Sequence, residues 1–388
     1  MQIKNFRINY YLLAQNILFS LLIIYFAQGS FYSQGSLISR TVLLFYLGIS
    51  ALFFIRYLLL KKKNRFSLMW TALFFLNVIG FILSGNFFDS SHFVMLRNIV
   101  IVLITFYPFF CFARKGVLKT KHLIWFFILM LPLAIFQYFQ NLRDITNNEL
   151  NGDIDVVNNV AYNFVNLLPF VFLIKKRNVL SLLCMFILMV FILLSYKRGA
   201  IIAGVIVLII FIYYKLRTVG IKNRQKSYFI TFIGILILVA FTYNLIKNNE
   251  YLIYRMQTLT ESGGSGRVRI YNDILSAWFN SKNPFNFFFG YGFAGSKELT
   301  GGYFAHNDWL EILSNFGLLG IFIYLGLLMS GLNHLKNSNW NIDKKLVMIV
   351  VLLIWLLISM ISMGYTSATT CFMSVIIAYL IGNNSAFI

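Results

Sequence analysis

Twelve long hydrophobic segments divide this 388-residue chain, and they constrain its fold more than any other feature. A helix needs about twenty apolar residues to cross the hydrocarbon core of a bilayer. Charged residues make up only 12% of the chain, against roughly 25% in soluble domains. The sequence therefore predicts an all-α integral membrane protein with about twelve transmembrane helices. The expected spans are residues 10–27, 37–60, 66–85, 93–113, 122–140, 158–174, 179–195, 199–214, 228–246, 308–332, 346–363 and 366–382.

Alternate connections between these segments carry most of the 33 basic residues, which is the pattern of the positive-inside rule. The intervening short loops 28–36, 86–92 and 364–365 hold no Lys or Arg. We therefore expect both termini in the cytoplasm. The net charge of +21 is largely this topology signal, so nucleic acid is excluded as a partner. The basic connections are Lys4–Arg7, Lys61–Arg65, Arg114–Lys121, Lys175–Arg177, Lys215–Lys226 and Lys336–Lys345.

Two connections on the predicted outer face are long enough to build a site. One is the acidic stretch 141–157, and the other is the large loop 247–307 between the ninth and tenth spans. A loop of this length between helices is usually functional. We expect residues 1–388 to form a single polytopic membrane domain, with the loop 247–307 carrying part of an active site.

Two cations stand where the seventh span turns into the eighth, at Lys197 and Arg198. They lie on the side that the positive-inside rule disfavours, and charge near the membrane is often retained for function. Arg198 would begin the eighth helix and could hold an anionic ligand at the membrane surface. An ordinary arginine that reaches toward the headgroups is the plain alternative.

A Gly/Ser-rich stretch in the large loop, residues 262–266, is followed by Arg267 and Arg269. The planar fork of arginine suits phosphate oxygens, and residues 270–279 are compatible with a short amphipathic helix. A flexible loop with solvated charges would look the same. The stretch is not a P-loop, because the G-x-x-x-x-G-K-[ST] pattern is missing.

His306 lies at the end of the large loop, directly before the tenth span. A neutral imidazole near pH 7 is the natural general base. Asn307 or Asp308 could cap the helix, and Asp308 with Glu311 has capping-box spacing. His306 could also simply anchor the helix at the membrane surface. Taken together, the three motifs predict a site for a phosphate-bearing substrate with one candidate base and no metal.

The segment 305–320 closely resembles the H-N-x-x-L-x-x-x-x-x-x-G-x-x-G signature of the O-antigen polymerase/ligase superfamily. Gly266-Arg267, Trp278 and Gly290-Tyr291-Gly292 fit the outer loop of that family. Arg198-Gly199-Ala200 fits its S-R-G-A segment, with Lys197 in place of the small residue before the arginine. Asn159 and Pro169 lie where the family has an asparagine-rich entry and a proline in a middle helix. The resemblance covers residues 155–330.

The resemblance implies a GT-C-like membrane glycosyltransferase of the bacterial cytoplasmic (inner) membrane, acting at its outer face. Its substrate would be a glycan on undecaprenyl pyrophosphate, and no cofactor or metal would be needed. Arg198 and Arg267, joined by Arg269, would hold the pyrophosphate while His306 takes a proton from the acceptor sugar. Further substrate-binding residues would be Lys197, Asn159, Tyr291, Asn307 and Glu311. Membrane lipid, a chain-length regulator and a flippase would be partners.

Three functions stay open at this point. We favour a polymerase of lipid-linked repeat units for O-antigen, capsule or exopolysaccharide, because the chain matches only the shared motifs and polymerases are the more divergent group. The alternative is an O-antigen ligase that transfers the glycan to lipid A–core or to a protein. The third hypothesis is a flippase of lipid-linked saccharides. Such a transporter should carry cations inside its spans, whereas most spans here lack charge, Arg56 being an exception.

Overall fold

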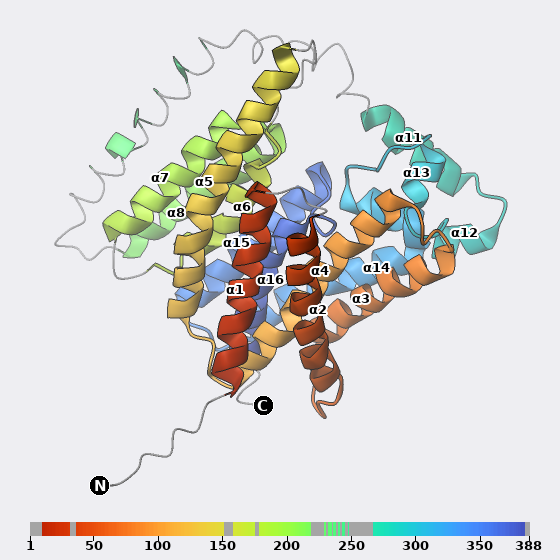
Figure 1. Cartoon of the computed structure of the whole chain (residues 1–388), viewed down its shortest axis with the longest axis horizontal. Coiled ribbons are helices and arrows are strands. Elements are labelled where there is room, and N and C mark those ends of the chain that lie inside the picture. Colours follow the sequence, from red (N-terminus) through yellow and green to blue (C-terminus); the bar gives the residue numbers. More distant parts are fainter. Residues whose placement is uncertain are drawn as a thin grey trace.

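The computed structural model describes residues 10–31, 36–150, 158–174, 178–218 and 267–384, with isolated positions between 229 and 247. These residues form helices and connecting loops, without a strand among them (Figure 1). The helices are α1 Tyr10–Phe31, α2 Leu37–Leu58, α3 Arg65–Ser84, α4 Ser90–Arg114, α5 Thr120–Leu150, α6 Ala161–Val171, α7 Asn178–Leu194, α8 Arg198–Thr218, α11 Arg267–Phe279, α12 Pro284–Phe289, α13 Gly295–Leu299, α14 Asp308–Asn337, α15 Ile342–Ile361, the 3-10 helix η2 Ala368–Thr370 and α16 Cys371–Asn384.

Eight of the described helices are long and apolar enough to cross a membrane, namely α1 to α5, α8, α14 and α15. Three shorter apolar helices correspond to α6, α7 and α16. The expected spans 158–174, 179–195 and 366–382 coincide with these three. Only isolated positions of the predicted span 228–246 are described, so the structure does not test it as a helix. The described part of the chain is thus all-helical, as in a multi-pass membrane protein, and the count of twelve spans stays a prediction.

Two helix boundaries differ from those predicted. Helix α5 continues to Leu150, ten residues into the predicted outer loop, since no Gly or Pro interrupts residues 141–150. Helix α15 ends at Ile361 and α16 begins at Cys371. The connection between them is therefore longer than the two residues expected from hydropathy. The Ser and Thr residues of this connection have hydropathy values near zero. A hydropathy pattern therefore includes them in a span, although they do not continue the helix.

The centre of the bundle is the pair formed by α4 and α16, which the other long helices surround (Figure 1). Helix α16 is almost wholly buried, from Cys371 to Gly382. A Cβ atom on Gly382 would lie only 2.7 Å from the Ala113 side chain and 2.7 Å from the Phe110 carbonyl. Small residues at such crossings let two membrane helices approach closely. At the other end of α16, the 3-10 helix η2 that precedes it contacts α4 and α6, so this loop lies against the central pair.

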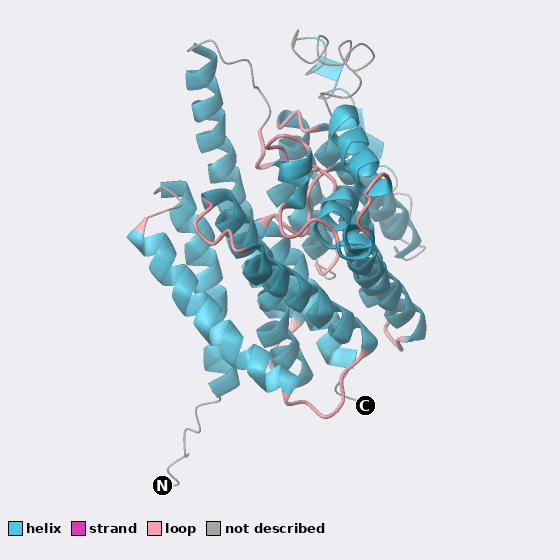
Figure 2. Cartoon of the chain, turned by 90° about the vertical axis from the view of Figure 1, so that its right-hand side faces the viewer, coloured by secondary structure: helices cyan, strands magenta, loops and turns pink. Residues whose placement is uncertain are grey.

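The short helices α11, α12 and α13 gather over the first part of α14, on the side that Figure 2 turns toward the viewer. Their loops meet α14 at a break in the helix, where Gly317 has φ 58° and ψ −150°. A Cβ atom on Gly317 would lie 2.6 Å from the Phe288 backbone, and one on Gly290 would lie 2.4 Å from the Phe316 nitrogen. Both glycines are therefore required for this close backbone contact.

Replacing Gly317 with alanine should destabilise the protein by about 1–3 kcal/mol from backbone strain alone. The displaced Phe288 backbone would add to this loss. The measurement is the apparent melting temperature of the purified protein in detergent. Gly48→Ala is the matched control, because Gly48 lies inside α2 and nothing stands within 4 Å of its Cβ position. An equal melting temperature for Gly317→Ala and the wild type would contradict the close contact.

Candidate functional site

His306 occupies a strained backbone position directly before α14, with φ 51°. A non-glycine residue in this left-handed region costs about 1–3 kcal/mol and is held there by its surroundings. On one side, the Ala305 N–H donates to a carboxylate oxygen of Glu311 at 3.0 Å. On the other side, Asn307 caps α14. The strained histidine is thus fixed from both directions.

Asn307, and not Asp308, is the N-cap of α14. Its side-chain oxygen accepts from the N–H groups of Trp309 at 2.9 Å and Leu310 at 3.1 Å. Its amide nitrogen donates to the Met360 carbonyl at 2.9 Å. One asparagine therefore fixes both the start of α14 and the end of α15, on the two sides of the loop that holds His306.

Glu311 is fully buried and lines neither of the cavities described below. One of its oxygens accepts from Ala305 N–H and from the Ser296 hydroxyl at 2.8 Å, and the other accepts from the Asn315 amide at 3.3 Å. All these partners belong to the protein. Glu311 therefore ties helix α13 and the loop before His306 to α14, where the sequence predicted a substrate contact.

Asp308 is also fully buried. One oxygen accepts from the Gly364 N–H at 2.8 Å, and the other accepts from the Tyr324 hydroxyl at 2.9 Å and the Tyr365 N–H at 3.4 Å. The Tyr324 hydroxyl in turn accepts from the Trp355 indole N–H at 2.7 Å. Asp308 therefore anchors the irregular segment between α15 and α16 to the beginning of α14.

Two cations lie close enough to His306 to act on its charge, Arg267 and Lys197. Arg267 donates to the Ile361 carbonyl at 2.6 Å, at the end of α15. Lys197 donates to the Asn159 side-chain oxygen at 2.8 Å and lies 5.8 Å above the Tyr162 ring. Partial burial of the imidazole, and then the positive charges of Arg267 and Lys197, lower the pKa of His306 below its usual value. The neutral ring, which can accept a proton, is therefore favoured.

Gly199 explains how the start of α8 reaches this cluster. A Cβ atom there would lie 2.7 Å from the Ile361 side chain and 2.8 Å from the Tyr162 hydroxyl. Without a side chain, the first turn of α8 packs directly against α6 and α15. Arg198 begins this helix, as predicted, and is half-buried. The glycine that follows it therefore brings the start of α8 against Ile361, the residue whose carbonyl accepts from Arg267.

A cavity of about 310 Å³ opens beside His306. Its wall comes from three regions that are distant in the sequence: the start of α6, the turn before α8 and the segment between α15 and α16. Asn159, Lys197 and His306 were predicted as site residues from the sequence, whereas the rest of this wall was not. Polar residues at helical spacing in an apolar span, Asn163 and Asn166, were a signal that could have found it. The missed lining residues are Tyr162, Asn163, Asn166, Ile358, Ser362, Met363, Gly364, Thr366, Ser367 and Thr370.

Two predicted site residues lie apart from the cluster. The Arg269 side chain is 87% exposed on α11, and its guanidinium lies 3.8 Å from the Asp273 carboxylate. Tyr291 donates its hydroxyl to the Ala277 carbonyl at 2.6 Å, which ties the loop before α13 to α11. The structure thus gathers Asn159, Lys197, Arg267 and His306, whereas it uses Tyr291 to hold the loop. Residues 262–266 lie outside the described part of the chain.

This combination defines a class of protein: a multi-pass membrane protein in which His306 and Lys197 line a cavity and Arg267 lies near the histidine. Residues 183–325 match the family described as O-Antigen ligase. The match confirms the resemblance to the O-antigen polymerase/ligase superfamily indicated by the motifs. It runs from α7 to the middle of α14 and includes Arg198, Arg267 and His306. No curated protein matches the chain.

Proposed function

We propose that this protein polymerises oligosaccharide repeat units carried on undecaprenyl pyrophosphate, at the outer face of the bacterial cytoplasmic membrane. One observation carries the proposal: His306, whose neutral form is favoured, lines a cavity together with Lys197, and Arg267 lies close enough to the histidine to act on its charge. A lipid-linked donor needs a cationic site for its diphosphate, and a sugar acceptor needs a base. Candidates for both, the cations Lys197 and Arg267 and the base His306, lie within the region that matches the family.

In the reaction, His306 removes the proton from an acceptor sugar hydroxyl, and the oxygen attacks the anomeric carbon of the donor. The bond between that carbon and the pyrophosphate oxygen breaks, and undecaprenyl pyrophosphate leaves. Arg267, Arg198 and Lys197 neutralise the negative charge that develops on the leaving group. The lipid pyrophosphate is already activated, so this route requires no metal or nucleotide.

The pH dependence of chain growth should report His306. Because the base must be neutral, the rate should fall as pH drops through the pKa of His306, which lies below the ordinary value near 6.5. Lys197→Gln removes one of the charges that lower this pKa, so the acid limb of the pH profile should move to higher pH. Rates from single-turnover assays between pH 5 and 8 provide the measurement. An acid limb that is unchanged in Lys197→Gln would count against His306 as the titrating base.

Glu311 should act by positioning His306. Glu311→Ala removes the acceptor for Ala305 N–H and frees the strained loop, so we expect the rate to fall by about 10²-fold. Glu311→Gln keeps one carbonyl oxygen at the same place and should restore most of the rate. Chain-growth rates and KM for the lipid-linked unit would be measured for both variants. Equal losses in the two variants, or a change in KM alone, would argue for direct substrate contact.

The decisive experiment uses purified protein and a single undecaprenyl-pyrophosphate repeat unit, with products sized on a gel. A ladder of lengths that disappears in Arg267→Ala supports the polymerase. The matched family is described as O-Antigen ligase, so transfer to a core oligosaccharide acceptor is the second candidate and the next assay. Transfer only to that acceptor would establish a ligase. An intact unit in both assays would overturn glycosyl transfer and favour a transporter.

A further inference from the structure

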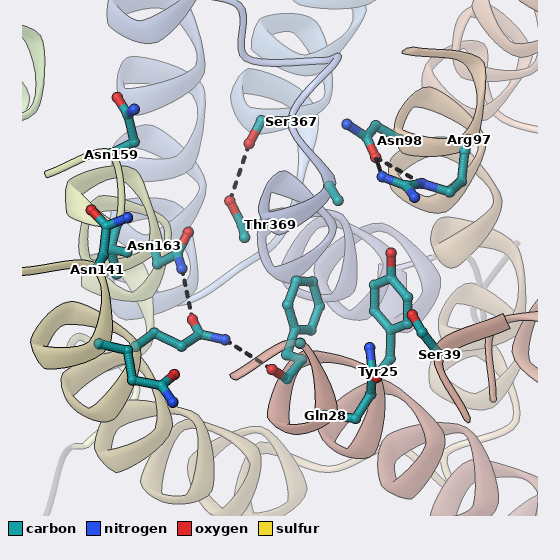
Figure 3. Close-up of a pocket in the computed structure, with 16 residues that line it drawn as sticks. Tyr25, Gln28, Ser39, Arg97, Asn98, Asn141, Asn159, Asn163, Ser367 and Thr369 are labelled. Atoms are coloured by element: carbon teal, nitrogen blue, oxygen red, sulfur yellow. Dashed lines mark hydrogen bonds between the residues drawn. The ribbon is translucent and has the colours of Figure 1, made fainter. Parts of the chain in front are cut away.

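A second and larger cavity, of about 480 Å³, adjoins the one at His306. It lies between the ends of α1, α4, α5 and α6 and the segment before α16 (Figure 3). Its volume falls within the range of about 300–1,000 Å³ that is usual for small-molecule sites. The two cavities share Asn159, Asn163 and Ser367 as lining residues. A ligand in the second cavity can therefore extend toward His306.

The wall of this cavity is rich in neutral amides, which are suited to hydroxyl groups because each offers both donors and an acceptor. Gln137 donates to the Phe26 carbonyl at 2.8 Å and accepts from the Asn163 amide at 3.0 Å (Figure 3). These bonds hold two amides in place before a ligand arrives. Within the described part of the chain, the side chains of Gln140 and Asn141 make no hydrogen bond and remain available.

Arg97 is the one charged residue among the described residues that line this cavity. Its guanidinium donates to the Asn98 side-chain oxygen at 3.1 and 3.3 Å. No described carboxylate forms an ion pair with it. Arg97 lies inside a membrane helix and is only partly exposed, so a charge held there without a counter-ion indicates an anionic ligand. In Figure 3, the guanidinium stands across the cavity from Asn159 and Asn163.

We propose that this cavity binds the sugars next to the reacting one, and that Arg97 selects a repeat unit with a carboxylate-bearing sugar. The proposal rests on the proposed function and adds the substrate class. A pyrophosphate would need several cations, and those gather beside His306 instead. One guanidinium among neutral amides matches one carboxylate on a hydroxyl-rich ligand, and its planar fork can bind both carboxylate oxygens.

The test measures binding without turnover. The full-length protein in detergent would be titrated with two disaccharides, glucuronosyl-glucose and glucosyl-glucose, and followed by saturation-transfer NMR. They differ by one carboxylate in place of a hydroxymethyl group. We expect the acidic disaccharide to bind about tenfold more tightly, and Arg97→Gln to remove this preference. Arg56→Gln loses the same charge elsewhere, on α2 beside Tyr10, and should keep the preference.

A second pair of variants tests the place of binding. Gly29 lines the cavity and a Cβ atom there would meet no atom within 4 Å, so the backbone accepts a side chain and Gly29→Trp should block binding of both disaccharides. Gly48→Trp adds the same group to α2 outside the cavity and should leave binding unchanged. Equal affinity for the two disaccharides, no binding of either at millimolar concentration, or a preference that survives Arg97→Gln would overturn the proposal.

Two further arms separate this proposal from others. Inorganic pyrophosphate should not displace the acidic disaccharide, and displacement that depends on Arg97 would show a phosphate site instead. His306→Ala should bind the acidic disaccharide as tightly as the wild type. If the wild type forms no polymer yet binds this disaccharide through Arg97, the proposed function fails while the saccharide site stands. If the wild type forms polymer but shows no preference for the carboxylate, the proposed function stands and the saccharide site fails.

Discussion

His306→Ala should abolish chain growth while leaving the protein folded. General-base catalysis typically contributes about 10² to 10⁴-fold, so we expect the rate to fall by at least 10²-fold. The fold should persist because the imidazole contributes no buried hydrogen bond among the described residues, and alanine keeps the capping of α14 by Asn307. The measurement is product length on a gel, together with melting temperature in detergent.

His334→Ala is the matched control for this variant. His334 lies at the far end of α14, where its ring contacts Asn384 and Trp340. Its removal should leave the rate of chain growth near that of the wild type. Normal polymer in His306→Ala would exclude His306 as the base, and equal losses in both variants would indicate a general effect on the protein.

Asp308→Ala should be among the most destabilising single substitutions in the protein. It leaves the Tyr324 hydroxyl and the N–H groups of Gly364 and Tyr365 without their common acceptor in a buried place. Each unsatisfied buried group costs about 1–3 kcal/mol, so we expect a loss of about 3–5 kcal/mol in total. The apparent melting temperature and the yield of folded protein in detergent provide the measurement.

Asp89→Ala is the control for this second prediction, since Asp89 caps α4 at an exposed position. Loss of such a cap costs about 1 kcal/mol. Tyr324→Phe removes one of the three donors to Asp308, together with the acceptor of the Trp355 indole N–H, and should give an intermediate effect. A melting temperature for Asp308→Ala that equals that of Asp89→Ala would mean that Asp308 is not the anchor of the segment between α15 and α16.

Much of the fold could be predicted because lipid imposes a simple rule. Backbone polar groups must be satisfied inside each span, so an apolar run of sufficient length becomes a helix. The expected spans therefore coincide with α1 to α8 and α14 to α16, and only 228–246 escapes a test. Boundaries were less predictable. The hydropathy of residues 362–367 is close enough to that of a span to predict helix, yet these residues form an irregular segment held by Asp308.

The candidate site could be predicted only in part, for a similar reason. Three short local motifs, far apart in the sequence, predicted Lys197, Arg267 and His306 as site residues. The structure brings these residues together. Arg269 has the same residue type and a neighbouring position, but it faces away on α11 and pairs with Asp273. A local sequence pattern does not tell which side of a helix faces its neighbours. It also could not predict that Glu311 is buried.

The sequence by itself determined that this chain is a bundle of membrane helices, and it identified a histidine and cations as candidates for chemistry. Hydropathy, charge alternation and short motifs are local properties, so they can be read without the fold. Only the tertiary structure decided that Asp308 and Glu311 are anchors, and that Asn163, Arg97 and the segment before α16 form cavity walls. These roles depend on contacts between residues far apart in the chain, such as 308 with 364, which packing alone creates.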